Sequence, residues 1–169
     1  LYGVIREAAG DAVVIACNAV SHLSAGIFEV YRTGDDTSGR LWSRTRAYGV
    51  NTLAFRLCQN DAFYKIDADC VGIIPGKIDW SLNRQWLDIL SVSGSPLFIS
   101  VKPDDITDSM KEDIKKAFFR NSGQKDIAEP LDWLYNNQPQ VWLINGEKRE
   151  YDFVENSYPE LLSGSTQSY

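Results

Sequence analysis

The segment Ala12–Cys17 reads Ala-Val-Val-Ile-Ala-Cys, a short and almost unbroken apolar run. Such a run is typical of a strand that is buried on both faces, as strands of a parallel sheet are. It is preceded by residues 1–9, which have the pattern of a helix that Gly10 would end. A helix that leads into a strand of this kind is the first sign of an alternating α/β chain.

The alternation continues through the first 123 residues. We expect further strands at residues 27–31, 62–66 and 96–101. We expect helices at residues 38–60, with an interruption near Gly49, at residues 81–92, and in the segment from Ile106 to Phe118. Four strands that alternate with helices through short connections predict a parallel sheet with right-handed crossovers.

The pattern changes after Gly123. Residues 140–144 and 147–154 flank Asn145-Gly146, which is the sequence signature of a β-hairpin with a type I′ turn. Residues 163–169 are polar and are expected to form a disordered tail. The sequence therefore predicts an α/β part over residues 1–123, and over 124–169 a linker and a hairpin that begins an antiparallel β-domain.

Composition limits the classes of function. The 169 residues carry 17 Lys+Arg against 23 Asp+Glu, a net charge of −6, which disfavours nucleic-acid and anionic-membrane partners. Three cysteines and one histidine give no disulfide framework, no Cys-x-x-Cys pair and no His-rich metal site, and no Gly-rich phosphate loop is present. We therefore predict no metal and no cofactor, and we leave the cellular location open.

Polar residues follow each predicted strand. Cys17-Asn18 follow the first strand, residues 32–36 (Arg-Thr-Gly-Asp-Asp) the second, Asp67-Ala68-Asp69 the third, and Ser100, Lys102, Asp104 and Asp105 the fourth. Because chemistry collects at the carboxyl ends of parallel strands, we expect these groups to meet on one face. A mixture of carboxylates, a guanidinium and an amide suits a polyhydroxylated ligand and general acid catalysis.

Each of these residues also has an ordinary structural interpretation. Asp35 to Ser38 could be a turn and the N-cap of the next helix. Arg32 could pair with Asp35 or with Glu29, and Asp67 and Asp69 could brace a loop. Cys17 alone is more often a small buried apolar residue than a working one.

The order of these motifs resembles the second half of the catalytic barrel of melibiase-type α-galactosidases, glycoside hydrolase families 27 and 36 and their relatives. The resemblance rests on Cys17-Asn18, on Arg32 followed four residues later by Asp36, on Trp42, on residues 67–70 (Asp-Ala-Asp-Cys) and on residues 83–100. Ala68 stands where that family usually has proline. The resemblance covers roughly residues 1–155 and implies the second half of a (β/α)8 TIM-type barrel, about four β/α units.

The resemblance also implies roles for individual residues. Asp36 matches the general acid/base, which protonates the leaving glycosidic oxygen and later activates water. Arg32, Cys17, Asn18 and Trp42 match positions that contact the sugar. Behind these positions lie supporting residues of the family, which match Asp35, Asp67 and Asp69. Asp36 is preferred to Asp35 as the general acid/base because of its four-residue spacing from Arg32.

One part of the pattern is missing from this sequence. The family's nucleophile is an aspartate in a Lys-x-Asp context on the fourth barrel strand, and a retaining mechanism needs two carboxyls about 5–5.5 Å apart. We therefore expect this chain to be the C-terminal half of the barrel, to need the N-terminal half as its partner and to be inactive alone. The sugar is not fixed by the sequence, beyond an α-galactoside or a related glycan.

Two alternatives remain open. The parent protein could be a non-catalytic carbohydrate-binding relative. The chain could also be a self-contained flavodoxin-like interaction domain, which predicts a monomer that unfolds cooperatively. The half-barrel interpretation instead predicts exposed apolar sheet edges and a tendency to form homo-oligomers.

Overall fold

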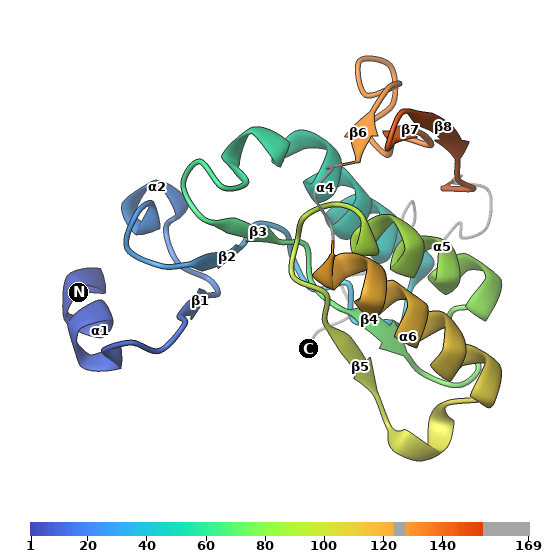
Figure 1. The fold of residues 1–169 in the computed structure, drawn as a ribbon, viewed down its shortest axis with the longest axis horizontal. Coiled ribbons are helices and arrows are strands. Elements are labelled where there is room, and N and C mark those ends of the chain that lie inside the picture. The colour runs from blue at the N-terminus through green and yellow to red at the C-terminus, as the bar shows by residue number, and fades with distance from the viewer. Residues whose placement is uncertain (124–127, 154–169) are drawn as a thin grey trace, which may run out of the picture.

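A computed structural model describes residues 1–123 and 128–153 (Figure 1). Its first sheet contains three short parallel strands in chain order, β1 (Ile15–Ala16), β2 (Val30–Arg32) and β3 (Lys65–Asp67). Val30 lies opposite Ile15 on one side and opposite Lys65 on the other. This register places Arg32 directly beside Asp67, at the carboxyl ends of β2 and β3.

A second parallel pair, β4 (Val71–Ile73) and β5 (Ile99–Val101), continues the chain beyond β3. Strand β4 was not among the predicted strands, because its three residues follow β3 after only Ala68, Asp69 and Cys70. The backbone turns between the two strands at Asp69, which has a φ of 74°. A break of this kind divides the parallel strands into two small sheets.

The helices follow the expected order with altered bounds. Helix α1 spans Tyr2–Ala9 and ends at Gly10, as predicted, and α2 spans Ser21–Ser24. The segment expected over residues 38–60 is helical only from Trp42, through α3 (Trp42–Arg44), a π-helical stretch (Thr45–Val50), α4 (Asn51–Phe55) and a 3-10 turn (Leu57–Gln59).

Gly49 lies in the π-helical stretch between α3 and α4, so the α-helical geometry is interrupted near Gly49 while the chain stays helical. A Cβ atom on Gly49 would lie 2.8 Å from the Trp86 ring, so the absence of a side chain lets the helix pack against that indole. The glycine therefore serves helix packing rather than helix termination.

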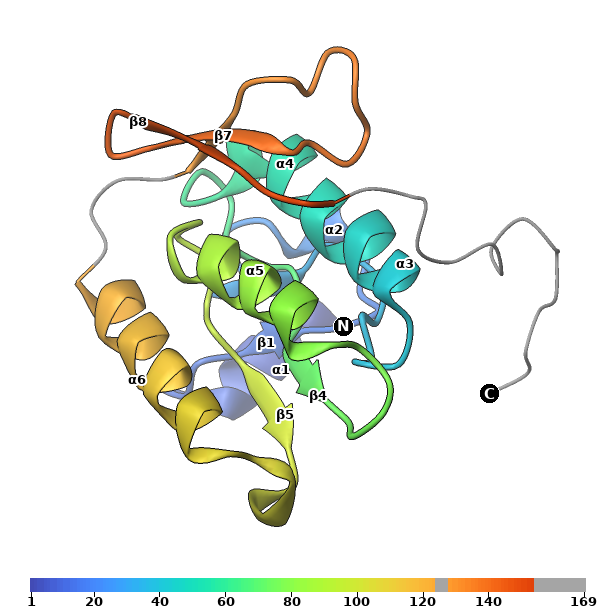
Figure 2. The ribbon, with the colours of Figure 1, turned by 90° about the vertical axis from the view of Figure 1, so that its right-hand side faces the viewer.

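Helices α5 (Trp80–Ser91) and α6 (Asp108–Ser122) lie side by side against the second sheet (Figure 2). Asp79 caps α5 by accepting a hydrogen bond from the Ser81 N–H, and Thr107 caps α6 by accepting one from the Met110 N–H. A 3-10 turn, Pro103–Asp105, connects β5 to α6.

The predicted hairpin is present as β7 (Val141–Ile144) and β8 (Glu147–Glu150), joined by Asn145 and Gly146 with φ values of 52° and 80°. A short strand that the sequence did not predict, β6 (Glu129–Pro130), pairs antiparallel with β7. The hairpin lies over α4 and α5 (Figure 2).

The hairpin shares one core with the α/β part. Trp142 and Phe153 belong to the same buried cluster as Trp42 and Trp86. Arg46 also joins the two parts, because its Nη1 donates to Gln138 Oε1 at 2.7 Å. The boundary expected between residues 123 and 124 thus marks a change of sheet type but no break in the core.

Strand β1 differs from its prediction. The run at residues 12–17 was expected to be buried on both faces, yet Val13 is 68% exposed and Ile15 is 47% exposed. The expectation of two-sided burial is wrong because β1 is the edge of its sheet and only two residues long. Within the described residues the fold is a mixed α/β arrangement with parallel strands, and these strands form no closed barrel.

The loop that follows β2 crosses β4 at two glycines. A Cβ atom on Gly72 would lie 2.7 Å from the Gly39 Cα atom, and one on Gly39 would lie 2.5 Å from the Gly72 carbonyl carbon. Both clashes involve backbone, which cannot move aside as the end of a flexible side chain can.

We expect Gly72→Ala to lower the free energy of unfolding by about 2 kcal/mol or more, because the added methyl group overpacks this crossing. Urea denaturation followed by circular dichroism measures the change. Gly3→Ala in α1 is the matched control, since no atom lies within 4 Å of its added Cβ. Equal stability of the two variants would contradict the close approach.

Candidate functional site

Arg32 is the centre of a charged cluster at the ends of β2 and β3. Its Nε donates to Asp67 Oδ2 at 2.8 Å, its Nη2 lies 3.0 Å from Asp69 Oδ1, and its Nη1 lies 3.2 Å from Asp36 Oδ1. The contact with Asp67 follows from the strand register, because neighbours in a parallel pair point to the same face. One guanidinium thus contacts three carboxylates from two chain segments, the loop after β2 and the end of β3 with its following turn.

The Asp69 carboxylate and the main-chain carbonyl of Asp67 hold the loop that carries Asp36. Asp69 Oδ2 accepts hydrogen bonds from the Thr37 N–H at 2.6 Å and from the Thr37 hydroxyl at 3.0 Å. Asp67 Oδ1 accepts the Asp69 N–H at 2.8 Å, and the Asp67 carbonyl accepts the Thr33 N–H at 3.0 Å. These bonds fix the loop on both sides of Asp36.

Asp36 and Asp35 face different partners. The Asp36 side chain is 62% exposed and contacts Arg32, whereas Asp35 pairs with Arg44 at 3.2 Å. The helix that follows begins at Trp42 with Leu41 as its N-cap residue, so Asp35 to Ser38 do not cap it. Asp35 does shape the turn, because its Oδ1 accepts the Asp36 N–H at 2.7 Å.

The pKa values in the cluster reflect these contacts. Burial alone would raise the pKa of Asp69, but the N–H groups of Thr37 and Cys70 and the Arg32 guanidinium outweigh it and lower that pKa. Burial raises the pKa of the Cys70 thiol to about 12, and the Asp69 carboxylate adds to the effect. Asp69 is therefore held as a carboxylate and Cys70 as a thiol.

The end of β1 lies near the cluster. Cys17 is exposed and lies close enough to Arg32 to contribute to its electrostatics. Asn18 is also exposed and adopts a left-handed backbone conformation with a φ of 55°. Both residues are accessible to a ligand at this sheet end. Cys17 is therefore not the small buried apolar residue that its type favours.

Trp42 is placed differently from the expectation. It is fully buried, and its ring centroid lies 5.9 Å from that of Phe153. The hairpin end covers this indole, so its ring offers no open face on which a sugar could stack. The polar residues expected at the end of the fourth strand are also placed differently, since Ser100 lies within β5, and in the described part of the chain Asp104 and Asp105 make no ion pair with Arg32.

Thr37, Gly39 and Gly72 also shape the cluster and were not among its predicted residues. Thr37 is buried and donates hydrogen bonds to Asp69, while the two glycines let the loop cross β4. The signal for Thr37 is its place beside Asp36. No sequence signal pairs Gly39 with Gly72, because the two positions are far apart in the chain.

Comparisons with known proteins give no assignment. No family model matches the chain, and no curated protein matches it either. Among the described residues no group of three or more His, Cys, Asp or Glu side chains is arranged to hold a metal ion. None of the described helices has the length and apolar character of a membrane span.

We expect Asp69→Asn to lower the free energy of unfolding at pH 7 by about 3 kcal/mol, because it removes the buried charge that faces Arg32 and leaves one acceptor oxygen where the carboxylate uses two, one toward Arg32 and one toward Thr37. The folded-state pKa of Asp69 lies below its usual 3.8. Its contribution is therefore complete above that pH and is lost as the pH falls through the folded value.

Urea denaturation at pH 7 and pH 3 tests this expectation. The difference in the free energy of unfolding between wild type and variant should be smaller at pH 3 than at pH 7. Asp61→Asn is the control, since Asp61 forms an exposed ion pair with Lys65 at 2.7 Å. This substitution should lower the free energy of unfolding by under about 1 kcal/mol. An Asp69→Asn variant as stable as the control would contradict the bracing role.

The three thiols should differ in reactivity. Cys17 and Cys58 are exposed, whereas Cys70 is partly buried and its pKa is raised to about 12. We expect Ellman's reagent at pH 8 to label two thiols rapidly in the folded chain and the third only after unfolding. Cys70→Ala should leave the rapid phase unchanged, and three equally fast thiols would disprove the protection.

Proposed function

We propose that the Arg32 cluster is part of the active site of a glycoside hydrolase that resembles the α-galactosidases. The observation that carries this proposal is an exposed carboxyl, Asp36, held beside a guanidinium that two buried carboxylates already fix. A carboxyl with an open face and a rigid setting is what proton transfer to a glycosidic oxygen requires.

The roles follow from the contacts. Asp36 would protonate the leaving oxygen and then, as a carboxylate, remove a proton from the attacking water. Arg32 would donate to sugar hydroxyls with the N–H groups that the carboxylates leave open. Since Asp67 and Asp69 already balance its charge, Arg32 does not bind Asp36 as a one-to-one ion pair.

The cluster supplies one of the two carboxyls that a retaining reaction needs. Asp67 and Asp69 are buried and hydrogen-bonded, and Asp35 pairs with Arg44, so none of these is open to attack an anomeric carbon. We propose that the nucleophile comes from a further β/α segment that adds to the open β1 edge, where Val13 and Ile15 are exposed. In this proposal the described strands form one half of a barrel, and the added segment belongs to the other half.

A binding function without turnover is the second candidate. This candidate is favoured because the carboxylates near Asp36 already form ion pairs. Asp67 and Asp69 pair with Arg32, and Asp35 pairs with Arg44. In that case the parent protein would hold a glycan at Arg32 and Asp36 and leave its bonds intact.

Binding of methyl α-D-galactoside to the 169-residue chain tests the shared part of the proposal. In ¹⁵N-resolved NMR titrations we expect the amide signals of Arg32 and Asp36 to shift, and Asp36→Asn to weaken binding by about tenfold through loss of a charge-assisted hydrogen bond. Asp61→Asn is the matched control, because Asp61 is also an exposed carboxylate in an i,i+4 ion pair.

Turnover of 4-nitrophenyl α-D-galactoside separates the remaining alternatives. We expect none from the chain alone. Turnover that Asp36→Asn abolishes would support the hydrolase but overturn the missing nucleophile. Absence of any shift at Arg32 and Asp36 with 100 mM galactoside would overturn carbohydrate binding at this cluster.

A further inference from the structure

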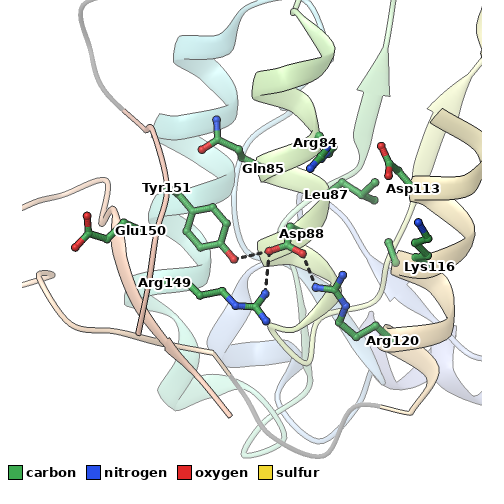
Figure 3. Close-up of a pocket in the computed structure, with 11 residues that line it drawn as sticks. Arg84, Gln85, Leu87, Asp88, Asp113, Lys116, Arg120, Arg149, Glu150 and Tyr151 are labelled. Atoms are coloured by element: carbon green, nitrogen blue, oxygen red, sulfur yellow. Dashed lines mark hydrogen bonds and ion pairs between the residues drawn. The ribbon is translucent and has the colours of Figure 1, made fainter. Parts of the chain in front are cut away.

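A second polar cleft lies away from the Arg32 cluster, where α5, α6 and β8 meet (Figure 3). Its volume is about 570 Å³. The walls come from elements that are distant in sequence, since Arg84 and Asp88 lie on α5, Lys116 and Arg120 on α6, and Arg149 on β8. The spacing of four residues within each helix places each pair on one helical face.

Asp88 organises the floor of this cleft. Its carboxylate accepts hydrogen bonds from the Tyr151 hydroxyl at 2.7 Å, from Arg149 Nη1 at 3.3 Å and from Arg120 Nη1 (Figure 3). Burial, with a contribution from Asp88, raises the pKa of Tyr151, so this phenol remains a neutral donor. Each guanidinium uses one of its five N–H groups on Asp88 and keeps others for a ligand.

Two further cations in the cleft lack partners. Within the described residues the side chains of Arg84 and Lys116 form no ion pair and no hydrogen bond. Asp113 is the acid on their side of the cleft, and it accepts the Trp80 indole N–H at 3.2 Å. Arg84 and Lys116 are therefore free to bind an anion that enters the cleft.

The charge balance of the cleft differs from that of the whole chain. Four cations line it against Asp88, Asp113 and Glu150, and Glu150 pairs with Lys148 at 2.9 Å. Figure 3 shows Glu150 apart from the groups around Asp88. Two positive charges are thus left unbalanced on a chain whose net charge is −6. Such a local excess in a concave site attracts anions.

We propose that this cleft binds a small phosphate monoester. A phosphate dianion matches the two unbalanced positive charges, and its three terminal oxygens accept bonds from guanidinium and ammonium donors at several angles. Gln85 adds a neutral donor, because its Oε1 accepts the Asp152 N–H at 2.6 Å and its Nε2 donates one N–H to the Ser81 carbonyl at 3.4 Å, which leaves a second N–H for a ligand. The volume leaves space for an organic group of about sugar size beside the phosphate.

Binding here would connect three parts of the fold. Arg84 belongs to α5, Lys116 to α6 and Arg149 to the hairpin, so one ligand would hold the hairpin against the helices. A ligand that binds only the folded state raises the unfolding temperature, and the rise grows with the logarithm of the ligand concentration above Kd. The site is independent of the Arg32 cluster, and its test does not depend on the hydrolase proposal.

Titration with glucose 6-phosphate, inorganic phosphate and glucose tests the proposal by NMR and thermal unfolding. We expect shifts at Arg84, Lys116 and Arg149, a higher melting temperature with both phosphates, tighter binding of the ester, and no effect of glucose. The double variant Arg84→Gln/Lys116→Gln should weaken ester binding at least tenfold through loss of charge-assisted hydrogen bonds. Lys102→Gln is the control, since Lys102 is exposed and lies outside the cleft.

A gain-of-binding variant keeps the test decisive if the double variant does not fold. Asp113→Asn removes an acid from the wall but keeps an acceptor for Trp80, and we expect it to tighten phosphate binding. Equal binding by wild type, the double variant and Lys102→Gln would mean non-specific attraction and overturn the proposal. Unchanged or weaker binding by Asp113→Asn would overturn it as well.

Discussion

The pair of buried carboxylates at Asp67 and Asp69 is the interaction on which the Arg32 cluster depends. Each is expensive to bury alone, and each is satisfied by Arg32 together with backbone N–H groups. The turn at Asp69 that divides the parallel strands is the same turn that aims its carboxylate at Thr37. Local backbone geometry and the shape of the candidate site therefore have a common cause.

The buried residues and the exposed residue of the cluster have different roles. Asp67 on β3 and Asp69 in the turn after it are buried and hydrogen-bonded, while Asp36 is presented to solvent on a loop held at both ends. A reacting group must be accessible, and its supports must not compete with it for the ligand. The arrangement meets both conditions with one arginine, because Arg32 contacts the supports and the exposed carboxyl together.

Much of the fold follows from the sequence by simple physical rules. The Asn145-Gly146 turn, the end of α1 at Gly10 and the alternation of strands with helices are local signals, and each is present. Strand β4 was missed because three residues are too few to show a pattern. The exposure of Val13 and the burial of Trp42 were not predictable, because they depend on which neighbours cover a residue rather than on its type.

The candidate sites, like the fold, could be predicted only where local sequence signals specify them. Polar residues after strands predicted that Arg32, Asp36, Asp67 and Asp69 belong together, since parallel strands end at one edge. The cleft around Asp88 left no such signal, because its residues come from two helices and a hairpin. Charges spaced four apart on a helix usually indicate an exposed face, and only packing of the hairpin against α5 turns that face into a cleft.

The crossing of Gly39 over Gly72 has a consequence for how relatives of this chain can be sought. A side chain at either position would displace the backbone at the other, so selection acts on the two positions as a unit. Relatives that retain this crossing should then keep glycine at both positions, because each added Cβ atom would meet backbone and a change at one position cannot compensate for a change at the other. Glycine at both positions, together with an arginine and an aspartate four residues apart, is a pattern by which such relatives can be sought.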